Sequence, residues 1–255
     1  MIQIKKITSI HHEIVKWAID LQDKKYREEE RLFAIEGRRA IDLACTSKLL
    51  LHTLLCTEST LAIAHQYAPE ETIVIVSEVI MRKISTQTTA AGLFGIFEIP
   101  QHIPIDALGN GIVLAQIHDP GNMGALIRTA VALQLPSIVI IDGTDPYSSK
   151  VVQASAGTIA FAPITFCSWE ELSAAAKTND ICLSALVIAD GKPITEMQQK
   201  KKRLLVIGSE AHGLPDQWIA SSSEQLTIPM PGHAESLNAA IAGSIAAYLV
   251  YMHQN

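Results

Sequence analysis

Apolar segments of strand length alternate with segments of helix length along residues 111–255, and this alternation constrains the fold more than any other feature of the chain. Strands that are apolar throughout and separated by helices are typical of a parallel sheet with both faces covered. The predicted fold class is therefore α/β, with a parallel sheet covered by helices. The expected strands are 112–117, 137–141, 181–187, 204–207 and 226–228, and the expected helices are 123–133, 169–177 and 236–252.

The first hundred residues predict a smaller α/β unit. Ser9 and Gly37 each precede an expected helix, and Ser77 is the expected N-cap of a helix over residues 78–84. Because proline, glycine and asparagine are typical of connecting segments, residues 101–110 are interpreted as a linker between domains 1–100 and 111–255. The expected strands of the first domain are 51–56, 72–76 and 92–99.

Composition limits the class of protein. Apolar residues make up 48% and charged residues 18% of the 255 residues, as in packed globular proteins. The first residues lack the features of a signal peptide, and the apolar run 239–252 is shorter than the ~20 residues that span a bilayer. We therefore expect a cytoplasmic protein without a membrane segment. The four cysteines and nine histidines show no ligand spacing, so no metal site is predicted.

The charge distribution leaves two interpretations open. A net charge of −6 argues against a strongly basic nucleic-acid binder, yet nine of the 20 cations lie within the first 39 residues. They form either a basic stripe that meets phosphates or a solvated face on which nearby glutamates pair with them. A second basic run, 200–203, is interpreted as a solvated face. The nine cations are Lys5, Lys6, Lys16, Lys24, Lys25, Arg27, Arg31, Arg38 and Arg39.

A first polar motif lies between the expected strand 112–117 and the helix that follows it. Gly121 and Gly124 are expected to permit a sharp turn, and the start of the helix favours an anionic group. Arg128 follows Gly124 by four residues, on the same helical face, where its planar cation can clamp a phosphate. Alternatively, Arg128 pairs with a carboxylate and Asn122 caps the helix.

Two further motifs follow the strands at 204–207 and 226–228. Glu210, in a glycine-flanked loop, either orients a substrate hydroxyl, accepts from a cofactor amine, or caps a helix. Ser236 and Asn238 either hold a substrate base or sugar, or Ser236 only caps the last helix. Neither a dinucleotide-binding glycine pattern nor a Ser/His/Asp set is evident in the sequence.

In this order, the three motifs resemble the signatures of the SpoU (TrmH-type) RNA 2′-O-ribose methyltransferases of the SPOUT class. The similarity continues between the first two motifs and extends into the first hundred residues, which resemble the L30e-like substrate-binding domain of the 23S rRNA branch. The residues that carry the resemblance are Asn122-x-Gly124-x-x-x-Arg128-Thr129, Gly208-x-Glu210-x-x-Gly213-Leu214, Ile228-Pro-Met230-x-Gly232-x-x-x-Ser236-Leu237-Asn238, then Asp142, Lys150, Ser155 and Gly157, and finally Arg27, Phe33-x-x-Glu36-Gly37 and Val79-Ile-Met81 through Gly92.

The resemblance implies a C-terminal deep trefoil knot, an S-adenosylmethionine pocket within it, and a homodimer formed by the knot helices. Catalysis would involve Arg128, with Asn122, Glu210, Ser236 and Asn238 orienting the nucleotide. Because a guanidinium stays protonated below about pH 12, Arg128 acts either as a base assisted by substrate phosphate or as a phosphate clamp. The expected cofactor residues are Gly208, Ile228, Met230 and Leu237, and the expected RNA contacts are Arg27, Arg38 and Arg39.

The function implied is S-adenosylmethionine-dependent methylation of a ribose 2′-hydroxyl in RNA, with a guanosine of 23S rRNA as the expected target. Transfer RNA is the rival substrate within the same class. A non-catalytic RNA-binding or ribosome-assembly factor that retains the fold is a different possibility, and an enzyme of a small anionic substrate is a third. The expected partners are RNA and a second copy of the chain, with no metal and no membrane.

Overall fold

The computed structural model describes residues 4–197 and 202–252, which divide into two compact units. Unit 1 comprises residues 1–100 together with 145–161, and unit 2 comprises residues 101–144 and 162–255. Two ranges differ from the prediction. Residues 101–110, predicted as a linker, lie in unit 2, and residues 145–161, predicted to belong to the second domain, lie in unit 1.

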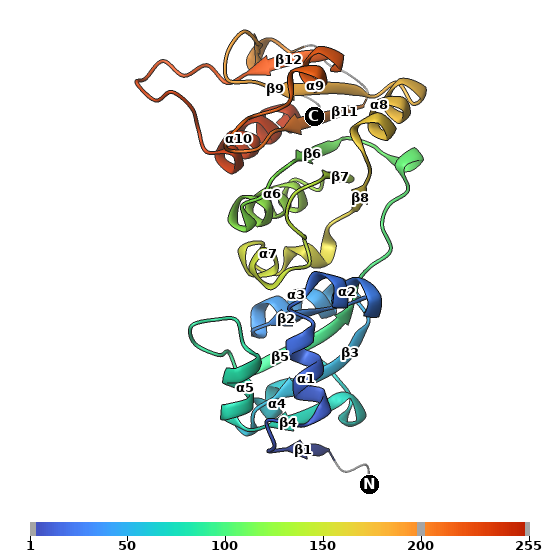
Figure 1. The fold of residues 1–255 in the computed structure, drawn as a ribbon, viewed down its shortest axis with the longest axis vertical. Coiled ribbons are helices and arrows are strands. Elements are labelled where there is room, and N and C mark those ends of the chain that lie inside the picture. The colour runs from blue at the N-terminus through green and yellow to red at the C-terminus, as the bar shows by residue number, and fades with distance from the viewer. Residues whose placement is uncertain (1–3, 198–201, 253–255) are drawn as a thin grey trace. The chain divides into compact units, whose positions relative to one another are not determined.

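Unit 1 is an α/β unit built on one sheet with helices on both faces (Figure 1). Its helices and strands are β1 (Lys5–Ile7), α1 (Glu13–Asp20), α2 (Lys24–Glu30), β2 (Leu32–Glu36), α3 (Arg38–Thr46), β3 (Leu51–Cys56), η1 (Glu58–Thr60), α4 (Leu61–Ala64), η2 (Glu70–Thr72), β4 (Ile73–Val76), α5 (Glu78–Ile84), β5 (Leu93–Glu98), α7 (Ser149–Ala154) and η4 (Thr158–Phe161).

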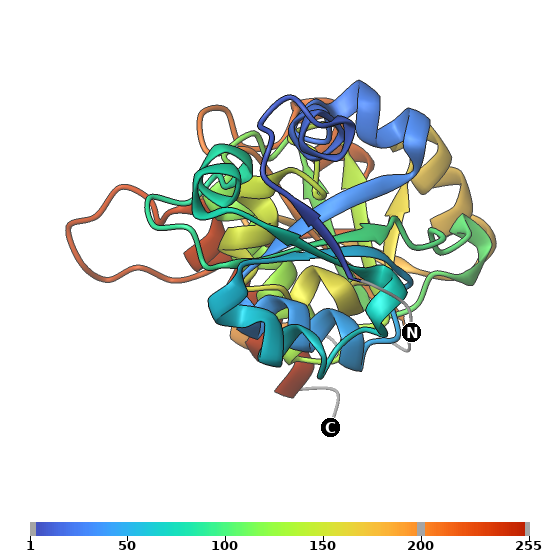
Figure 2. The ribbon, with the colours of Figure 1, turned by 90° about the horizontal axis from the view of Figure 1, so that it is seen from below.

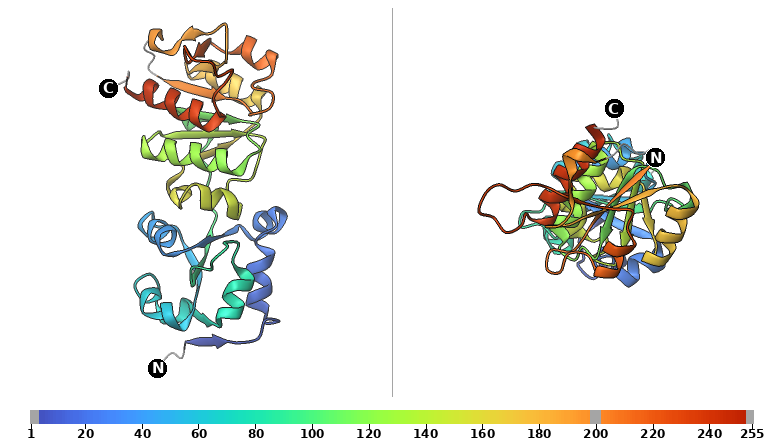
Figure 3. Two further views of the ribbon diagram at one scale, coloured as in Figure 1. Left: turned by 90° about the vertical axis from the view of Figure 1, so that its left-hand side faces the viewer. Right: turned by 90° about the horizontal axis from the view of Figure 1, so that it is seen from above.

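The sheet of unit 1 has the strand order β1-β4-β3-β5-β2 in the described part of the chain. Strands β1, β4 and β3 run parallel, and β5 is antiparallel to both β3 and β2. Helices α1 and α5 cover one face, where Val15, Ala18, Ile80 and Met81 pack against the sheet, and α3 and α4 lie on the other (Figure 3). The predicted strands and the N-cap Ser77 are confirmed, whereas the helix expected after Ser9 begins only at Glu13.

A buried ion pair fixes segment 145–161 to α2. Arg27 is only 3% exposed, and its guanidinium donates to the Asp145 carboxylate through Nε at 2.9 Å and Nη2 at 2.5 Å, and to the Leu21 carbonyl at 2.7 Å. The predicted RNA contact of Arg27 is therefore wrong, because the described structure engages its charge inside the protein. Its position on a helix that carries both cations and glutamates did not reveal this, since the partner lies 118 residues away in sequence.

Unit 2 consists of a parallel sheet with helices on both faces, as the sequence predicts. Its elements are η3 (Ile105–Ala107), β6 (Gly111–Ala115), α6 (Pro120–Ala132), β7 (Ser137–Ile141), β8 (Ile164–Phe166), α8 (Trp169–Thr178), β9 (Cys182–Leu186), β10 (Lys192–Pro193), η5 (Ile194–Glu196), β11 (Arg203–Ile207), α9 (Asp216–Ser221), β12 (Glu224–Thr227) and α10 (Ala239–Met252).

In the residues described, the strands of unit 2 are ordered β10-β12-β9-β11-β6-β7-β8, and all neighbours pair in parallel. Helices α8 and α9 pack on one face of this sheet, and α6 and α10 pack on the other. The close approach of α10 depends on Gly243, because a Cβ there would lie 2.6 Å from Leu126 and 2.7 Å from Ile207. The segment between β12 and α10 forms a long loop that extends away from the strands of this unit (Figure 2).

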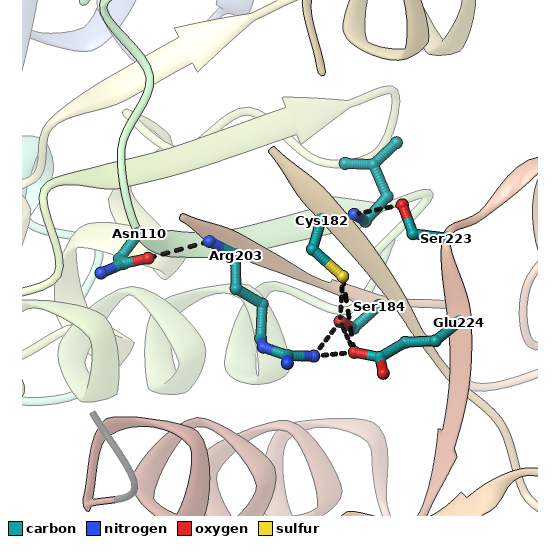
Figure 4. Close-up of polar contacts among 7 residues, drawn as sticks. Asn110, Cys182, Ser184, Arg203, Ser223 and Glu224 are labelled. Carbon is teal, nitrogen blue, oxygen red and sulfur yellow. Dashed lines mark hydrogen bonds and ion pairs between the residues drawn. The ribbon is translucent and has the colours of Figure 1, made fainter. Parts of the chain in front are cut away.

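A buried polar cluster joins β9, β11 and β12 at the start of β11 (Figure 4). Arg203 is 1% exposed; its Nη1 donates to Ser184 Oγ at 2.5 Å and also to Glu224 Oε1. Ser184 Oγ donates to the same carboxylate oxygen at 2.7 Å, and burial lowers the pKa of the Arg203 guanidinium. The prediction of a solvated face at 200–203 is therefore wrong for Arg203, while Lys202 is exposed and 200–201 lie outside the described residues.

Replacing Glu224 with alanine is expected to destabilise unit 2 by about 3–5 kcal/mol, because it leaves the buried Arg203 charge without this carboxylate. Urea unfolding followed by tryptophan fluorescence measures the effect, since Trp169 and Trp218 stack at 4.9 Å in unit 2. The double variant Arg203→Met, Glu224→Leu removes both charges and should recover most of the lost free energy. Equal stability of Glu224→Ala and the unmodified chain would contradict a stabilising role for the pair.

Candidate cofactor pocket and active site

The second and third motifs line one cavity of about 440 Å³ at the carboxyl ends of the central strands of unit 2. This edge is where open parallel sheets bind ligands. One wall is the loop after β11, another is the segment after β12, and the start of α10 closes the cavity. The four residues expected to hold the cofactor, Gly208, Ile228, Met230 and Leu237, all line it, as do Glu210, Ser236 and Asn238.

The sequence did not reveal the wall formed by the end of β9. Leu186, Val187 and Ile188 line the cavity there, and Ile188 is 63% exposed. These residues carry no polar group and belong to no motif. Their only sequence signal was their place at the end of an apolar strand, which marks the ligand-binding edge of a parallel sheet once the strand order is known.

One amide side chain connects the three motifs. Asn122 Nδ2 donates to Glu210 Oε1 at 2.6 Å, and Asn238 Nδ2 donates to Asn122 Oδ1 at 3.0 Å. The donor and the acceptor of the Asn122 amide are thus each used by a different motif. Glu210 and Asn238, which lie 88 and 116 positions after Asn122 in the sequence, are thereby held beside the cavity. Hydrogen bonds to the Asn122 amide set the orientation of both side chains.

The second motif folds into a tight loop. Ser209 N donates to Gly213 O at 3.1 Å, and Gly213 N donates to Ser209 O at 3.0 Å. Gly213 has a φ of +66°, a conformation in which glycine is favoured. Gly208 lies directly against the closing residues of this loop, since a Cβ there would be 2.4 Å from the Gly213 carbonyl carbon. The loop presents Glu210 to the Asn122 amide, which donates to it.

The start of the first motif differs from the predicted turn. Gly121 and Gly124 lie inside α6, which Asp119 caps by accepting from Asn122 N at 2.8 Å. Asp119 therefore supplies the anionic group expected at this helix N-terminus, and Asn122 is not the cap. Gly124 is buried within this helix.

Arg128 is exposed on α6 and does not line the cavity. It makes neither an ion pair nor a side-chain hydrogen bond with residues 4–197 and 202–252, so the alternative in which it pairs with a carboxylate finds no support there. The neighbouring Thr129 hydroxyl lies 2.8 Å from Ser244 Oγ, which links α6 to α10. Arg128 is thus a free cation on a helix that is fixed to the cavity by Asn122.

The last helix begins later than predicted. Asn238 Oδ1 accepts from Ala240 N at 2.9 Å and from Ile241 N at 3.2 Å, so Asn238 caps α10 in place of Ser236. Ser236 lies in the exposed loop that precedes the helix. Asn238 therefore has two roles, because its carbonyl oxygen caps the helix while its amide group binds Asn122.

The cations of unit 1 do not behave as one stripe. Lys24 and Lys25 pair with Glu28 and Glu29 on exposed α2, and Lys6 pairs with exposed Glu58, which supports the solvated interpretation for these three. Arg31 donates to the carbonyl oxygens of Ile99 and Pro100. The remaining predicted RNA contacts, Arg38 and Arg39, are exposed and line a second cavity, within unit 1.

The cysteines are free thiols. Burial raises the pKa of Cys56 to about 11, and burial with the nearby Glu171 charge raises that of Cys167 to about 11. Both stay protonated at neutral pH, and a protonated thiol is a poor metal ligand and nucleophile. Among the residues described, no group of three or more histidine, cysteine or acidic side chains is placed to hold a metal ion.

A family model described as the SpoU rRNA methylase family matches residues 110–248. The chain belongs to the SpoU rRNA methylase family. A second model, described as the MRM3-like substrate binding domain, matches residues 12–95 of this SpoU methylase. The sequence prediction of the family is confirmed. In the described ranges of the methylase, no helix has the length and apolar character needed to cross a membrane.

Two curated rRNA methyltransferases and one solved structure are similar to this SpoU methylase over nearly the whole length of each chain. The 23S rRNA (guanosine(2553)-2′-O)-methyltransferase RlmP of Bacillus subtilis is 25% identical over 96% of this chain and 98% of its own. The 23S rRNA (uridine(2479)-2′-O)-methyltransferase of Streptomyces viridochromogenes is 26% identical over 96% and 91%. The crystal structure of an AdoMet-bound rRNA methyltransferase from Sinorhizobium meliloti superimposes with a TM-score of 0.88 at 27% identity, covering 98% of each chain.

Proposed function

We propose that this SpoU methylase transfers a methyl group from S-adenosylmethionine to the 2′-hydroxyl of a guanosine ribose in 23S ribosomal RNA. The observation that carries the proposal is the hydrogen-bonded chain Glu210–Asn122–Asn238, which joins the three family motifs beside one cavity. The activities named for the relatives in Bacillus subtilis and Streptomyces viridochromogenes support the ribose oxygen as the methylated atom and ribosomal RNA as the substrate. Of these two relatives, only the Bacillus subtilis enzyme supports guanosine as the target nucleoside.

The cavity suits S-adenosylmethionine. Its volume of about 440 Å³ is in the range of small-molecule sites, and its walls combine aliphatic side chains with glycine backbone and a few polar groups. Gly208, Ile228, Met230 and Leu237 would hold the cofactor, which supplies a methyl group activated by its positive sulfonium. The similarity to an AdoMet-bound structure supports this assignment.

The polar side chains would position the ribose. Methyl transfer requires the 2′-oxygen to lie in line with the methyl group, and holding the reactants in such a geometry can contribute about 7–11 kcal/mol to a reaction. Asn122, Glu210 and Asn238 restrain one another, so they offer preset hydrogen-bonding groups at the edge of the cavity. Ser236 lies in the exposed loop and would contact the nucleotide there.

Arg128 would act on the RNA rather than on the cofactor. It is an exposed cation whose charge the described residues leave unpaired, and an arginine fork matches a phosphate. We assign it the binding of the phosphate beside the target ribose and polarisation of the 2′-hydroxyl. A phosphate oxygen held in this way is placed to accept the hydroxyl proton as the methyl group is transferred.

The proposal includes a homodimer and the knotted form of the C-terminal segment that the family resemblance implies. Support for the dimer comes from α10, where Ile241, Ile245 and Tyr248 are 53%, 40% and 52% exposed at helical spacing. Such a stripe of large apolar side chains on one helix is typical of a protein interface. Because Arg128 does not line the cavity of its own chain, a site shared between two copies would bring the cation and the cofactor together.

A methyl-transfer assay tests the function. Purified protein is incubated with labelled S-adenosylmethionine and an unmodified transcript of 23S ribosomal RNA, and the RNA is digested to nucleosides for mass spectrometry. We expect 2′-O-methylguanosine. Methylation of another ribose would correct the nucleotide and keep the reaction, whereas label on a base would contradict the proposal. Calorimetry that detects no S-adenosylmethionine binding to folded protein would favour a non-catalytic RNA-binding factor.

A further inference from the structure

Unit 1 contains a second cavity, of about 290 Å³, that the proposed reaction does not use. It opens at the turn between β2 and α3, and its walls come from this turn, from the segment after α5, and from α7. Its size is at the lower end of the range for ligand sites, which fits a single ring system rather than a large cofactor.

Segment 145–161 makes one wall of this cavity, and two contacts hold the segment in place. The Arg27–Asp145 ion pair anchors its beginning. Near its end, Gly157 packs on α3 so closely that a Cβ would lie 2.7 Å from Ala40 Cα. Val152 and Gln153 of α7 therefore face the β2–α3 turn across a cavity whose two sides are both fixed.

The mouth of the cavity is cationic. Arg38 and Arg39 are exposed and line it, and neither forms an ion pair or side-chain hydrogen bond with the part of the chain that the structure describes. They occupy the first turn of α3, which carries no acidic residue and follows Gly37, a residue without a side chain to cap the helix. Two cations at the positive end of a helix dipole are unfavourable, and an anion beside them relieves this repulsion.

The other polar residues that line the cavity carry no positive charge. Glu36 lines the cavity; its carboxylate accepts from Ser85 Oγ and from Thr86 N at 3.3 Å, and it retains further acceptor positions. The half-buried Gln87 and the exposed Gln153 add amide donors and acceptors to the lining, and buried Phe94 adds an aromatic surface. A free phosphate would meet the Glu36 charge inside. A nucleotide avoids this conflict, because its phosphate stays at the arginines while its neutral base enters.

We propose that the unit 1 cavity binds one unpaired nucleotide of the RNA substrate, at a position separate from the methylated ribose. Arg38 and Arg39 bind its phosphate, and Glu36, Gln87 and Gln153 hydrogen-bond to the edge of its base. Reading an unstacked base in this way is the usual route to sequence-specific RNA recognition. The inference rests on the proposed function for the identity of the ligand as RNA.

The test measures binding of an unmodified 23S ribosomal RNA transcript by filter retention across a salt series, without S-adenosylmethionine. For the double variant Arg38→Ala, Arg39→Ala we expect about tenfold weaker binding. The slope of log affinity against log salt should also fall by roughly 0.7, because the contact with one phosphate of a single strand is lost. The matched control Arg82→Ala, Lys83→Ala removes the same charge from exposed positions of α5 that do not line the cavity. It should change the slope little.

A second pair of variants separates base recognition from charge. Gln153→Phe places a bulky side chain on the α7 wall of the cavity without altering charge and should weaken binding about tenfold at an unchanged salt slope, whereas Gln153→Ala removes bulk from this wall and should cost less. Fluorescence of Trp17 in unit 1 checks that each variant is folded. The proposal is overturned if Gln153→Phe binds like the unmodified chain, or if both double variants behave alike. The binding measurement contains no methyl donor, so it can be interpreted even if the methyl-transfer assay fails. If methylation is normal and the variants bind RNA like the unmodified chain, only the nucleotide site in unit 1 is rejected.

Discussion

Arg128→Ala is expected to reduce kcat/KM for methyl transfer by about 10³-fold, because it removes the cation that we propose binds phosphate and stabilises charge as the 2′-oxygen reacts. The affinity for S-adenosylmethionine should stay within about twofold, since Arg128 does not line the cavity. Single-turnover methylation of the 23S transcript measures the first quantity and calorimetry the second.

Arg128→Lys is the matched control for this change. Lysine keeps the charge but loses the planar fork that binds phosphate through two hydrogen bonds. If the fork is required, the lysine variant should remain severely impaired; if charge suffices, it should recover a large part of the activity. Turnover near that of the unmodified chain in Arg128→Ala would show that the assignment of Arg128 to the reaction is wrong.

The sequence predicted the scaffold of unit 2 well because its strands are buried on both faces. Val113 and Val206 pack under α8 and α9, while Leu205 and Ile207 belong to the other face, which α6 and α10 cover. Every position in such a strand must then be apolar, so the ends of each apolar run in the sequence mark the ends of the strand. Strand β2 was not predicted, because it lies at the edge of the unit 1 sheet and follows the charged helix α2 almost directly.

The sequence singled out residues that the structure brings together, but it did not predict their contacts. Order and spacing of the motifs identified Asn122, Glu210 and Asn238, yet the hydrogen bonds among them depend on tertiary distances that no local pattern contains. The misassigned caps have the same origin. Ser236 and Asn122 are good capping residues by type, but Asn238 and Asp119 occupy the positions where the backbone enters α10 and α6.

Buried charges were the least predictable feature. Arg27 and Arg203 lie in cation-rich stretches that suggest solvent or RNA, and both are almost fully buried. Each is stabilised by a carboxylate far away in sequence, Asp145 or Glu224, and that pairing offsets the cost of removing a charge from water. Arg27, Arg203 and the paired lysines are therefore not candidates for RNA binding. Arg38 and Arg39 remain candidates, because they are exposed and line a cavity.

Gly208→Ala is expected to weaken S-adenosylmethionine binding by about 100-fold. The added Cβ would lie 2.4 Å from the Gly213 carbonyl carbon and 2.6 Å from both Gly213 O and Leu214 N. These are backbone atoms, so the loop of the second motif must move as a whole. Displacing it breaks the paired hydrogen bonds between Ser209 and Gly213, which give one wall of the cofactor cavity its shape.

Gly232→Ala provides the matched control in the third motif. A Cβ at Gly232 meets no heavy atom of the described residues within 4 Å, so this variant should bind S-adenosylmethionine within about twofold of the unmodified chain. Calorimetric titration of both variants measures the difference, and a 100-fold loss corresponds to about 2.7 kcal/mol. Equal affinities would show that the cofactor does not depend on the loop after β11, and the pocket assignment would fail with it. A loss confined to Gly208→Ala would instead tie cofactor binding to the close contact between Gly208 and Gly213.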